Sequence, residues 1–310
     1  MPKSNNLESQ LAALNALRAA PVTNAARDAL RKALAGKNSH VVAAAAEIVA
    51  ENELSELEAD LVKAFGGLLR QSAKADPGCR AKHALADALY HLESAAEDVF
   101  LPGARHVQME PVWGGQADTA AALRGVCGLG LVRMRHRHAL IVVADLLADP
   151  EPDARIAAAR ALGYSGDLAA APLLRFKARS GDERPEVIYE CFLALLKLDA
   201  ETALPFVADF LRCDDPALAE SAALALGESR LDGALDVLSA AWEDTFDADR
   251  RRILLLAIAT LRTEAAIDYL LEIVRGDARS HAAAALEALR MYQSDPAIWR
   301  RVTQARAAMQ

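Results

Sequence analysis

Residues 149–163 have the sequence DPEPDARIAAARALG, and this stretch decides the fold. An acidic turn containing prolines leads into an alanine-rich run that ends on Ala161-Leu162-Gly163, a pattern typical of a helix start followed by a helix. The Ala-Leu or Ala-Ile pair returns four times downstream, at spacings of 33, 31, 32 and 31 residues. A fixed period of this length indicates a repeat protein. These later anchor positions are Leu195, Leu226, Ile258 and Leu289.

Two further sets of residues follow the same period. Upstream of Leu162 the anchors lie at spacings of 33, 40, 41 and 31 residues, counted backwards, at Leu129, Leu89, Ile48 and Leu17. In the other half of the downstream units an alanine recurs, and two residues after it comes a proline or an aspartate. Both residue types favour the first turn of a helix, so each unit is predicted to be helix, turn, helix. These alanines are Ala170, Ala203, Ala234 and Ala266.

The composition agrees with a fold built from closely packed helices. Of the 310 residues, 53% are hydrophobic but only 5% are aromatic, which argues against a core built from sheets. A hairpin of about 32 residues cannot bury its own apolar face, so neighbouring hairpins have to stack. We therefore expect an all-α fold, a right-handed α-α solenoid of about nine helical hairpins that forms a single domain over residues 1–310.

The quoted stretch resembles the second half of a HEAT-like repeat, of the short variety first associated with phycobilisome bilin lyases. The shared features are the acidic turn, Arg155 after an apolar residue, the paired alanines and the Ala-Leu-Gly end. The resemblance implies HEAT-like hairpins. It also implies an alternative function, an accessory lyase or enzyme subunit that binds a small prosthetic group. HEAT-like hydroxylases carry iron on His-Glu dipeptides, which this sequence lacks.

Two anchor spacings exceed the period by about eight residues, and insertions in solenoids lie in loops, often on the binding face. The first excess falls in the turn 72–80, which we interpret as a long connection. The second forms an irregular insertion at 101–119, the least repeat-like segment of the chain. Trp113 and Met109 either pack this loop against the helices or belong to a surface for a ligand or partner. Asp118-Thr119 is predicted to cap the next helix.

The same region concentrates positive charge. Residues 101–140 contain five arginines against Glu110 and Asp118, a local charge of +3 in a chain whose formal net charge is −8. The segment 133–138 is either an anion-binding patch or a solvated turn whose cations suit a helix C-terminus. Arg124 either binds an anion or is solvated. The candidate binding residues are Arg105, His106, Gln108, Glu110, Trp113, Arg124, Arg133, Arg135, His136 and His138.

No set of residues predicts a catalytic centre, a metal site or a cofactor. His83, Asp87 and His91 are spaced to meet on one helix face, but Asp87 can simply pair with a histidine. Cys127 and Cys191 fall inside second helices, where burial in the core is expected. The four cysteines contain no Cys-x-x-Cys pair, which is typical of reduced thiols in a cytoplasmic protein.

The charge and the repeat register argue against nucleic acid as a partner. Neither of two rows of equivalent positions on the inner helices forms a basic stripe. No uncharged run is long enough to span a membrane, and no export signal precedes the first repeat. The first row is Lys82, Ala122, Arg155, Ile188, Ala219, Arg251 and Ala282, and the second is His83, Leu123, Ile156, Tyr189, Glu220, Arg252 and Ala283.

These patterns favour a soluble scaffold or adaptor over an enzyme. We expect it to bind another protein through its curved surface, with the 101–119 loop and the turn 133–138 acting together. The accessory lyase stands as the alternative. A nucleic-acid base glycosylase is a third possibility, which the charge disfavours.

Overall fold

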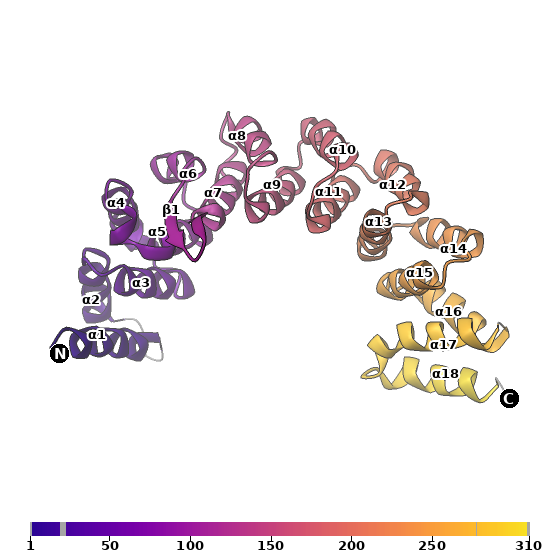
Figure 1. Cartoon of the computed structure of the whole chain (residues 1–310). Coiled ribbons are helices and arrows are strands. Elements are labelled where there is room, and N and C mark those ends of the chain that lie inside the picture. The colour runs from indigo at the N-terminus through magenta and orange to yellow at the C-terminus, as the bar shows by residue number, and fades with distance from the viewer. Residues whose placement is uncertain (1, 19–22, 277, 309–310) are drawn as a thin grey trace. The chain divides into compact units, whose positions relative to one another are not determined.

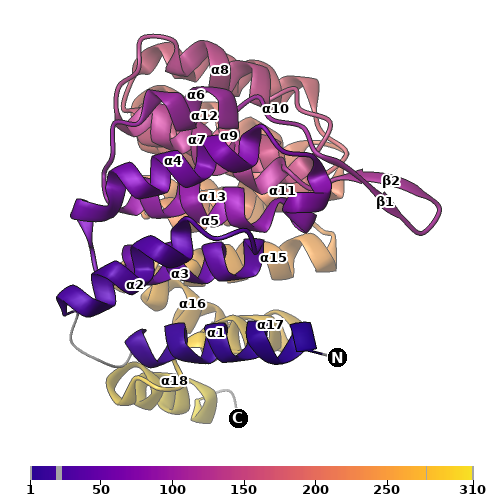
Figure 2. The ribbon, with the colours of Figure 1, turned by 90° about the vertical axis from the view of Figure 1, so that its left-hand side faces the viewer.

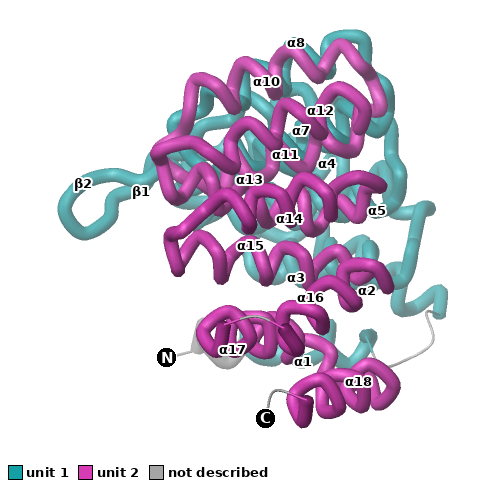
Figure 3. Tube along the Cα trace, turned by 90° about the vertical axis from the view of Figure 1, so that its right-hand side faces the viewer, with its two compact units in different colours: residues 1–165 teal, residues 166–310 magenta. Residues whose placement is uncertain are grey.

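A computed structural model describes residues 2–18, 23–276 and 278–308. The chain forms two compact units, Met1–Ser165 and Gly166–Gln310, drawn in teal and magenta in Figure 3. Each unit is built almost wholly from α-helices (Figure 1), so the predicted all-α class is confirmed.

Unit 1 is a stack of helical hairpins. The second helix of each hairpin, α3, α5, α7 or α9, packs against the second helix of the next, and the first helices, α2, α4, α6 and α8, each cover their own partner. Helix α1 packs against α3 and so extends the row of second helices. The bounds are α1 (Pro2–Arg18), α2 (Asn24–Leu34), α3 (Ser39–Glu51), α4 (Glu58–Leu69), α5 (Arg80–His91), α6 (Glu97–Gly103), α7 (Ala121–Arg133), α8 (Ala139–Leu146) and α9 (Pro152–Ser165).

Unit 2 follows the same rule. Helices α11, α13, α15 and α17 form the row of second helices, α10, α12, α14 and α16 cover them, and α18 packs against α16. The predicted stack of helix-turn-helix units is therefore present in each unit, while one continuous domain over 1–310 stays a prediction. The bounds are α10 (Ala171–Ser180), α11 (Pro185–Leu198), α12 (Ala200–Ala208), α13 (Pro216–Ser229), α14 (Ala234–Asp244), α15 (Ala248–Thr260), α16 (Glu264–Gly276), α17 (Arg279–Ala288) and α18 (Pro296–Ala307).

The anchor residues lie in the row of second helices, except that Leu289 begins a short 3-10 helix (Leu289–Tyr292) directly after α17. Leu17, in the first helix of the row, is only partly buried, and one anchor is wrong in register. Leu162, Leu226 and Ile258 are fully buried, as an anchor should be. Leu129, however, is only partly buried, whereas Leu131 is 0% exposed and stands 31 residues before Leu162. The Gly-Leu-Gly motif at 128–130 resembles Ala-Leu-Gly but lies two residues before the true anchor. Its glycines have a different role, which is to leave room for side chains from α6 and α8. The anchor of α7 is therefore Leu131.

This correction moves α7 by two positions in the rows of equivalent residues. Arg124 replaces Ala122 in the first row, which then begins Lys82, Arg124, Arg155. All three cations are nevertheless buried, with exposed fractions of 1%, 3% and 6%. They are consequently part of the interior and do not form a basic stripe on the surface.

The insertion is more regular than the sequence predicts. Its first residues complete α6, and residues 109–118 form an antiparallel β-hairpin of β1 (Met109–Val112) and β2 (Gly115–Asp118). Val112 pairs with Gly115 across the two-residue turn Trp113-Gly114. Gly114 has a φ of 88°, a conformation that glycine adopts without the steric cost of a side chain. The expectations of an irregular loop and of a chain without strands are wrong here, because this turn and the polar contacts described below order the segment.

Among the described residues, no helix combines the length and the apolar character needed to cross a bilayer.

Candidate functional site

The β-hairpin is the most distinctive local feature of unit 1, and hydrogen bonds at its base hold it in place. Beyond the strands, the Thr119 N–H donates to the Gln108 carbonyl oxygen at 3.0 Å, which extends the ladder by one pair. The Gln108 N–H donates to Asp118 Oδ1 at 3.0 Å. The same carboxylate oxygen accepts the Ala120 N–H at 2.9 Å, immediately before α7. Asp118 thus orders the link before α7 but does not cap the helix, because Ala120 is the N-cap residue and no side chain of the described residues bonds to the first turn of α7. The predicted cap at Asp118-Thr119 is wrong, and the Thr119 hydroxyl donates back to the hairpin.

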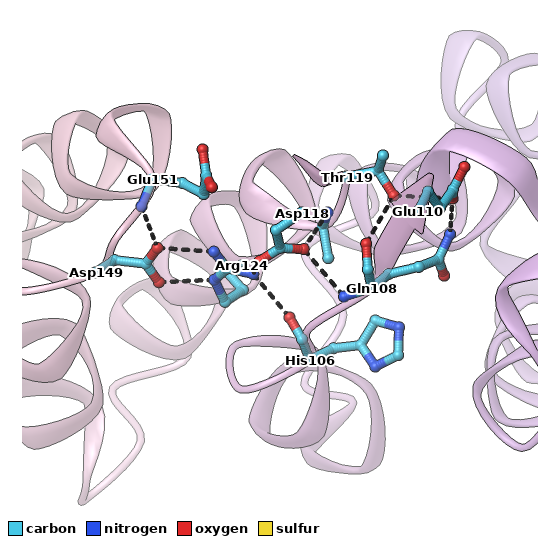
Figure 4. Close-up of polar contacts among 9 residues, drawn as sticks. His106, Gln108, Glu110, Asp118, Thr119, Arg124, Asp149 and Glu151 are labelled. Atoms are coloured by element: carbon cyan, nitrogen blue, oxygen red, sulfur yellow. Dashed lines mark hydrogen bonds and ion pairs between the residues drawn. The ribbon is translucent and has the colours of Figure 1, made fainter. Parts of the chain in front are cut away.

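Arg124 on α7 joins the hairpin base to the start of α9 (Figure 4). Its Nε and Nη2 both donate to the Asp149 carboxylate at 2.7 Å, and its Nη1 donates to Asp118 Oδ2 at 2.6 Å. Nη1 also donates to the His106 carbonyl oxygen at 2.9 Å. Since the side chain is 3% exposed, Arg124 is neither the solvated residue nor the anion-binding group expected from the sequence. Its charge is used to hold three segments of unit 1 together.

A second set of contacts joins the hairpin to the turn before α5. The Glu110 carboxylate accepts the Gly78 N–H at 2.8 Å, the Gln108 Nε2–H at 2.5 Å and the Thr119 hydroxyl at 3.0 Å. Gln108 Nε2 also donates to the carbonyl oxygen of Asp76 at 2.8 Å. The turn at 72–80, which the sequence suggests is a plain connection, therefore supports the hairpin.

Asp76 is itself buried in an ion pair. Its carboxylate accepts the N–H groups of Ala81 and Lys82 at 2.8 and 3.0 Å, and Lys82 Nζ lies 3.2 Å from Oδ2. The side chains of Asp76 and Lys82 are 0% and 1% exposed. Because buried charges are tolerated only when paired and hydrogen-bonded, this pair fixes the start of α5. We call Asp76, Gln108, Glu110, Asp118, Thr119, Arg124 and Asp149 the polar anchor.

The environment of the polar anchor lowers the pKa of two of its acids, Glu110 and Asp118. Hydrogen bonding from the Gln108 side chain, assisted by the Gly78 N–H and against a small effect of burial, lowers the pKa of Glu110 below its usual value. Burial alone would raise the pKa of Asp118, but the N–H groups of Gln108 and Ala120 and the Arg124 guanidinium outweigh it and lower that pKa. For Arg124, burial opposes the charge, but Asp149 and Asp118 raise its pKa.

The strands themselves expose apolar side chains. Met109 and Pro111 lie on the face opposite to Glu110, because side chains alternate along a strand. Met109 is 48% exposed, and Trp113 at the turn is 104% exposed. Figures 2 and 3 show β1 and β2 extending beyond the helices of unit 1. Trp113 and Met109 thus do not pack against the helices. We call the four large exposed apolar residues of this segment the hairpin surface: Val107 (59%), Met109, Val112 (50%) and Trp113.

Arg105 and His106 lie at the base of the hairpin. Arg105 is exposed, whereas His106 is partly buried and its imidazole is directed away from Arg124 in Figure 4. Burial lowers the pKa of His106, and its Nε2 is a buried atom without a hydrogen-bond partner among the described residues. The neutral imidazole is therefore the form that this environment favours.

The basic segment 133–138 lies apart from the hairpin. It follows the C-terminus of α7, and a helix of 13 residues separates it from the hairpin by about 18 Å. Arg133 lies over the Tyr90 ring at 4.5 Å and donates to the Ser94 carbonyl at 2.9 Å. His136 Nε2 is 3.3 Å from Glu97. The expectation that this segment and the 101–119 loop act together on one surface is not supported, since they lie at opposite ends of one helix.

The structure thus places the ten candidate residues in the polar anchor, on the hairpin surface, in the basic segment and at the base of the hairpin. Gln108, Glu110 and Arg124 belong to the polar anchor, with His106 beside it, and Trp113 belongs to the hairpin surface. In the basic segment, Arg135 and His138 are exposed while Arg133 and His136 contact neighbouring residues. Arg105 is exposed at the base of the hairpin.

Sequence reasoning missed two acids of the anchor, Asp76 and Asp149. The available signal is an acid six residues before a cation: Asp76 precedes Lys82, Asp118 precedes Arg124, and Asp149 precedes Arg155. In the last case the Arg155 side chain donates to the Asp149 carbonyl oxygen at 2.9 Å. The error of register in α7 concealed this spacing, because it placed Ala122 where Arg124 belongs.

Of the cysteines and histidines that could have carried other chemistry, two cysteines are buried in the core and His91 is paired with a neighbouring side chain. Cys127 and Cys191 are buried, and burial raises the pKa of both thiols, that of Cys191 to about 12. His91 Nδ1 is 3.4 Å from the Asp87 carboxylate, the pairing given above as the alternative to metal binding. Within the described ranges, no group of three or more His, Cys, Asp or Glu side chains is arranged to hold a metal ion.

Comparison with known proteins gives a family match for part of the chain. The sequence matches the family of HEAT repeats over residues 175–259, which lie within unit 2. No curated protein matches the chain. The solved structures that resemble it include the CpcE–CpcF complex of phycocyanin lyase from Nostoc sp., with 19% identity, covering 94% of this chain and 96% of that chain, at a TM-score of 0.38.

Two further solved structures are similar at the same level. Human deoxyhypusine hydroxylase in complex with glycerol has 18% identity, covering 78% of this chain and 99% of that chain, with a TM-score of 0.33. An engineered protein has 16% identity, covering 98% of this chain and 89% of that chain, with a TM-score of 0.39. The family match agrees with the HEAT-like repeats inferred from the sequence.

Proposed function

We propose that this chain is a protein-interaction module that binds another protein through the hairpin surface. The observation that carries the proposal is the exposure of Met109, Val112 and Trp113 on one short hairpin and of Val107 just before it. Large apolar side chains that are exposed together in one short segment are unusual on a protein surface and are typical of binding sites. Tryptophan is also among the residues that contribute most to binding free energy at protein interfaces.

The polar anchor supports this function because it orders the hairpin in advance. An isolated two-stranded hairpin is at best marginally stable in water. Here Glu110 bonds to the turn before α5, and Asp118 bonds to Arg124, which in turn bonds to Asp149 at the start of α9. A segment that is already ordered loses less conformational entropy on binding, so more of the contact energy appears as affinity.

The test compares two exposed aromatic residues in the full-length protein. Trp113→Ser removes the centre of the hairpin surface, and Phe246→Ser removes a side chain that is 89% exposed in unit 2. Each variant is used as bait in a pull-down from cells of the source organism, with quantitative mass spectrometry. We expect a partner that the wild type and Phe246→Ser recover and that Trp113→Ser loses. Equal recovery by all three would refute the assignment of the site.

The accessory lyase that the sequence resemblance suggests makes a different prediction. A lyase subunit should bind a tetrapyrrole, which visible absorbance and native mass spectrometry of the purified chain detect. Binding that is unaffected by Trp113→Ser, together with an unchanged pull-down, would favour that alternative over the adaptor.

A further inference from the structure

A second candidate interaction site lies in unit 1, away from the hairpin. A groove of about 780 Å³ runs between α1, α2 and the start of α3. Its wall on α1 includes Leu7, Leu14 and Leu17, and its wall on α2 includes Ala29 and Ala33. Leu7 and Leu17 remain partly exposed. They lie on the side of α1 that a neighbouring helix covers in the other hairpins of the stack.

The repeat architecture says what kind of element fits this groove. In unit 1 each of α3, α5, α7 and α9 is covered by its own first helix, and successive first helices contact each other, as α2 does α4 and α4 does α6. Helix α1 belongs to the row of second helices through its contact with α3. Among the described residues no first helix covers α1, and the groove lies between α1 and α2, the two helices that such a helix would contact.

The dimensions of the groove suit an α-helix. The lining residues of α1 run from Leu7 to Leu17, a distance of about 15 Å at 1.5 Å per residue. This is close to the length of α2, which has 11 residues. On the other wall Ala29 and Ala33 are one turn apart on α2 and Gly36 lies in the bend after it, and such small residues leave room for another helix to pack.

The charge at the rim of the groove indicates which kind of helix would bind there. Lys32 and Lys37 are exposed at the edge of the groove, which favours a helix with acidic side chains beside its apolar face. The last helix of a second copy, α18, is a poor match, because its exposed cations Arg300 and Arg306 would approach these lysines. The geometry points to a docking site for an acidic amphipathic helix of another protein, which takes the place of a first helix over α1 and α2.

The probe for this site is a fluorescein-labelled synthetic peptide that copies residues 231–247 of the chain. This segment contains α14, a first helix whose buried face includes Leu238 and Trp242 and which carries Asp236, Glu243 and Asp244. Fluorescence anisotropy measures its binding to the full-length protein. We expect saturable binding that weakens as salt is added, since part of the attraction is electrostatic.

Matched variants distinguish the groove from the rest of unit 1. Ala13 lines the groove and Ala12 does not, although both are exposed on α1. We expect Ala13→Glu to weaken peptide binding by about tenfold or more, because it blocks the groove and repels the acidic probe, while Ala12→Glu has little effect. Lys32→Glu should also weaken binding, and Lys74→Glu, at an exposed lysine outside the groove, should not. Equal circular dichroism spectra establish that the variants are folded.

Three results would overturn the proposal. The first is the absence of saturable binding to the wild type. The second is equal binding by Ala13→Glu and Ala12→Glu, or equal binding of a peptide in which the acids are replaced by lysine. The third is self-association of the wild type in sedimentation experiments that Ala13→Glu abolishes, which would identify a second copy as the occupant. The pull-down with Trp113→Ser tests the hairpin surface separately from these three results, because the hairpin lies between α6 and α7 and the groove is formed by α1, α2 and α3.

Discussion

At the scale of single residues, Arg124 is a buried charged group that links three segments of unit 1. Its side chain uses four donor contacts, to Asp118, to both oxygens of Asp149 and to a backbone carbonyl. Bidentate contacts of this kind combine strength with fixed geometry. The group therefore positions the hairpin base relative to α7 and α9, and its removal leaves two carboxylates without their cation.

Arg124→Ala should lower the free energy of unfolding by about 3–5 kcal/mol, because breaking a buried pair leaves an uncompensated buried charge. Urea denaturation followed by circular dichroism measures this change. The control is Arg212→Ala, whose partner Asp244 forms an ion pair with both side chains more than 60% exposed. An exposed pair contributes about 0–1 kcal/mol, so similar losses in the two variants would contradict the structural role of Arg124.

Glu110 adds a pH dependence whose sign follows from its lowered pKa. A carboxyl group with a lowered pKa in the folded state stabilises that state above its ordinary pKa of 4.5, and this stabilisation is lost as the pH falls through the folded-state value. We expect the melting temperature of wild type to fall more between about pH 6 and about pH 3 than that of Glu110→Gln. The control is Glu201→Gln, at an exposed position, whose melting temperature should fall with pH by the same amount as that of wild type.

At the scale of elements, close packing of the second helices decides the register. Gly125 faces the Cβ of Ala157 on α9, and a Cβ at Gly130 would lie within 2.5 Å of the Phe100 ring. These contacts place Leu131 in the layer that Leu162 occupies in the next hairpin. The glycines of α7 are thus explained by tight helix contacts, as expected from the sequence, but they also conceal the repeat register.

The corrected register is tested by a pair of truncations on one helix. Leu131→Ala should lower the free energy of unfolding by about 2–5 kcal/mol, the range for a fully buried leucine. Leu129→Ala should cost distinctly less, because that side chain is only partly buried. Thermal or urea unfolding of the two variants gives the comparison. A larger loss for Leu129→Ala would restore the original register.

At the scale of the whole molecule, the fold consists of repeated local interactions. Each second helix packs chiefly against those before and after it in sequence, as α13 packs against α11 and α15. Stability in such stacks is close to a sum of repeat and nearest-neighbour contributions. The same principle applies within each compact unit.

This arrangement predicts how far a local defect extends. Leu226→Ala, which empties a fully buried position on α13, should reduce hydrogen-exchange protection most in α13 and next in α11 and α15. Protection in α5 of unit 1 should change least. Hydrogen exchange with mass spectrometry of the full chain measures the gradient. A uniform loss over all helices would indicate a single cooperative globule instead of a stack.

The sequence by itself was enough to infer the all-α class and the helix-turn-helix period, because each repeat carries its own turn, helix starts and buried leucine. The hairpin and its anchor were decided only by the tertiary structure. Glu110 meets Gly78 from 32 residues away, and Arg124 meets Asp149 from 25 residues away, so no local pattern contains these contacts. The exposure of Trp113 likewise depends on the tertiary structure, which places no other described part of unit 1 close enough to cover it. Periodic packing is local information, whereas the ordering of an insertion depends on residues that only folding brings together.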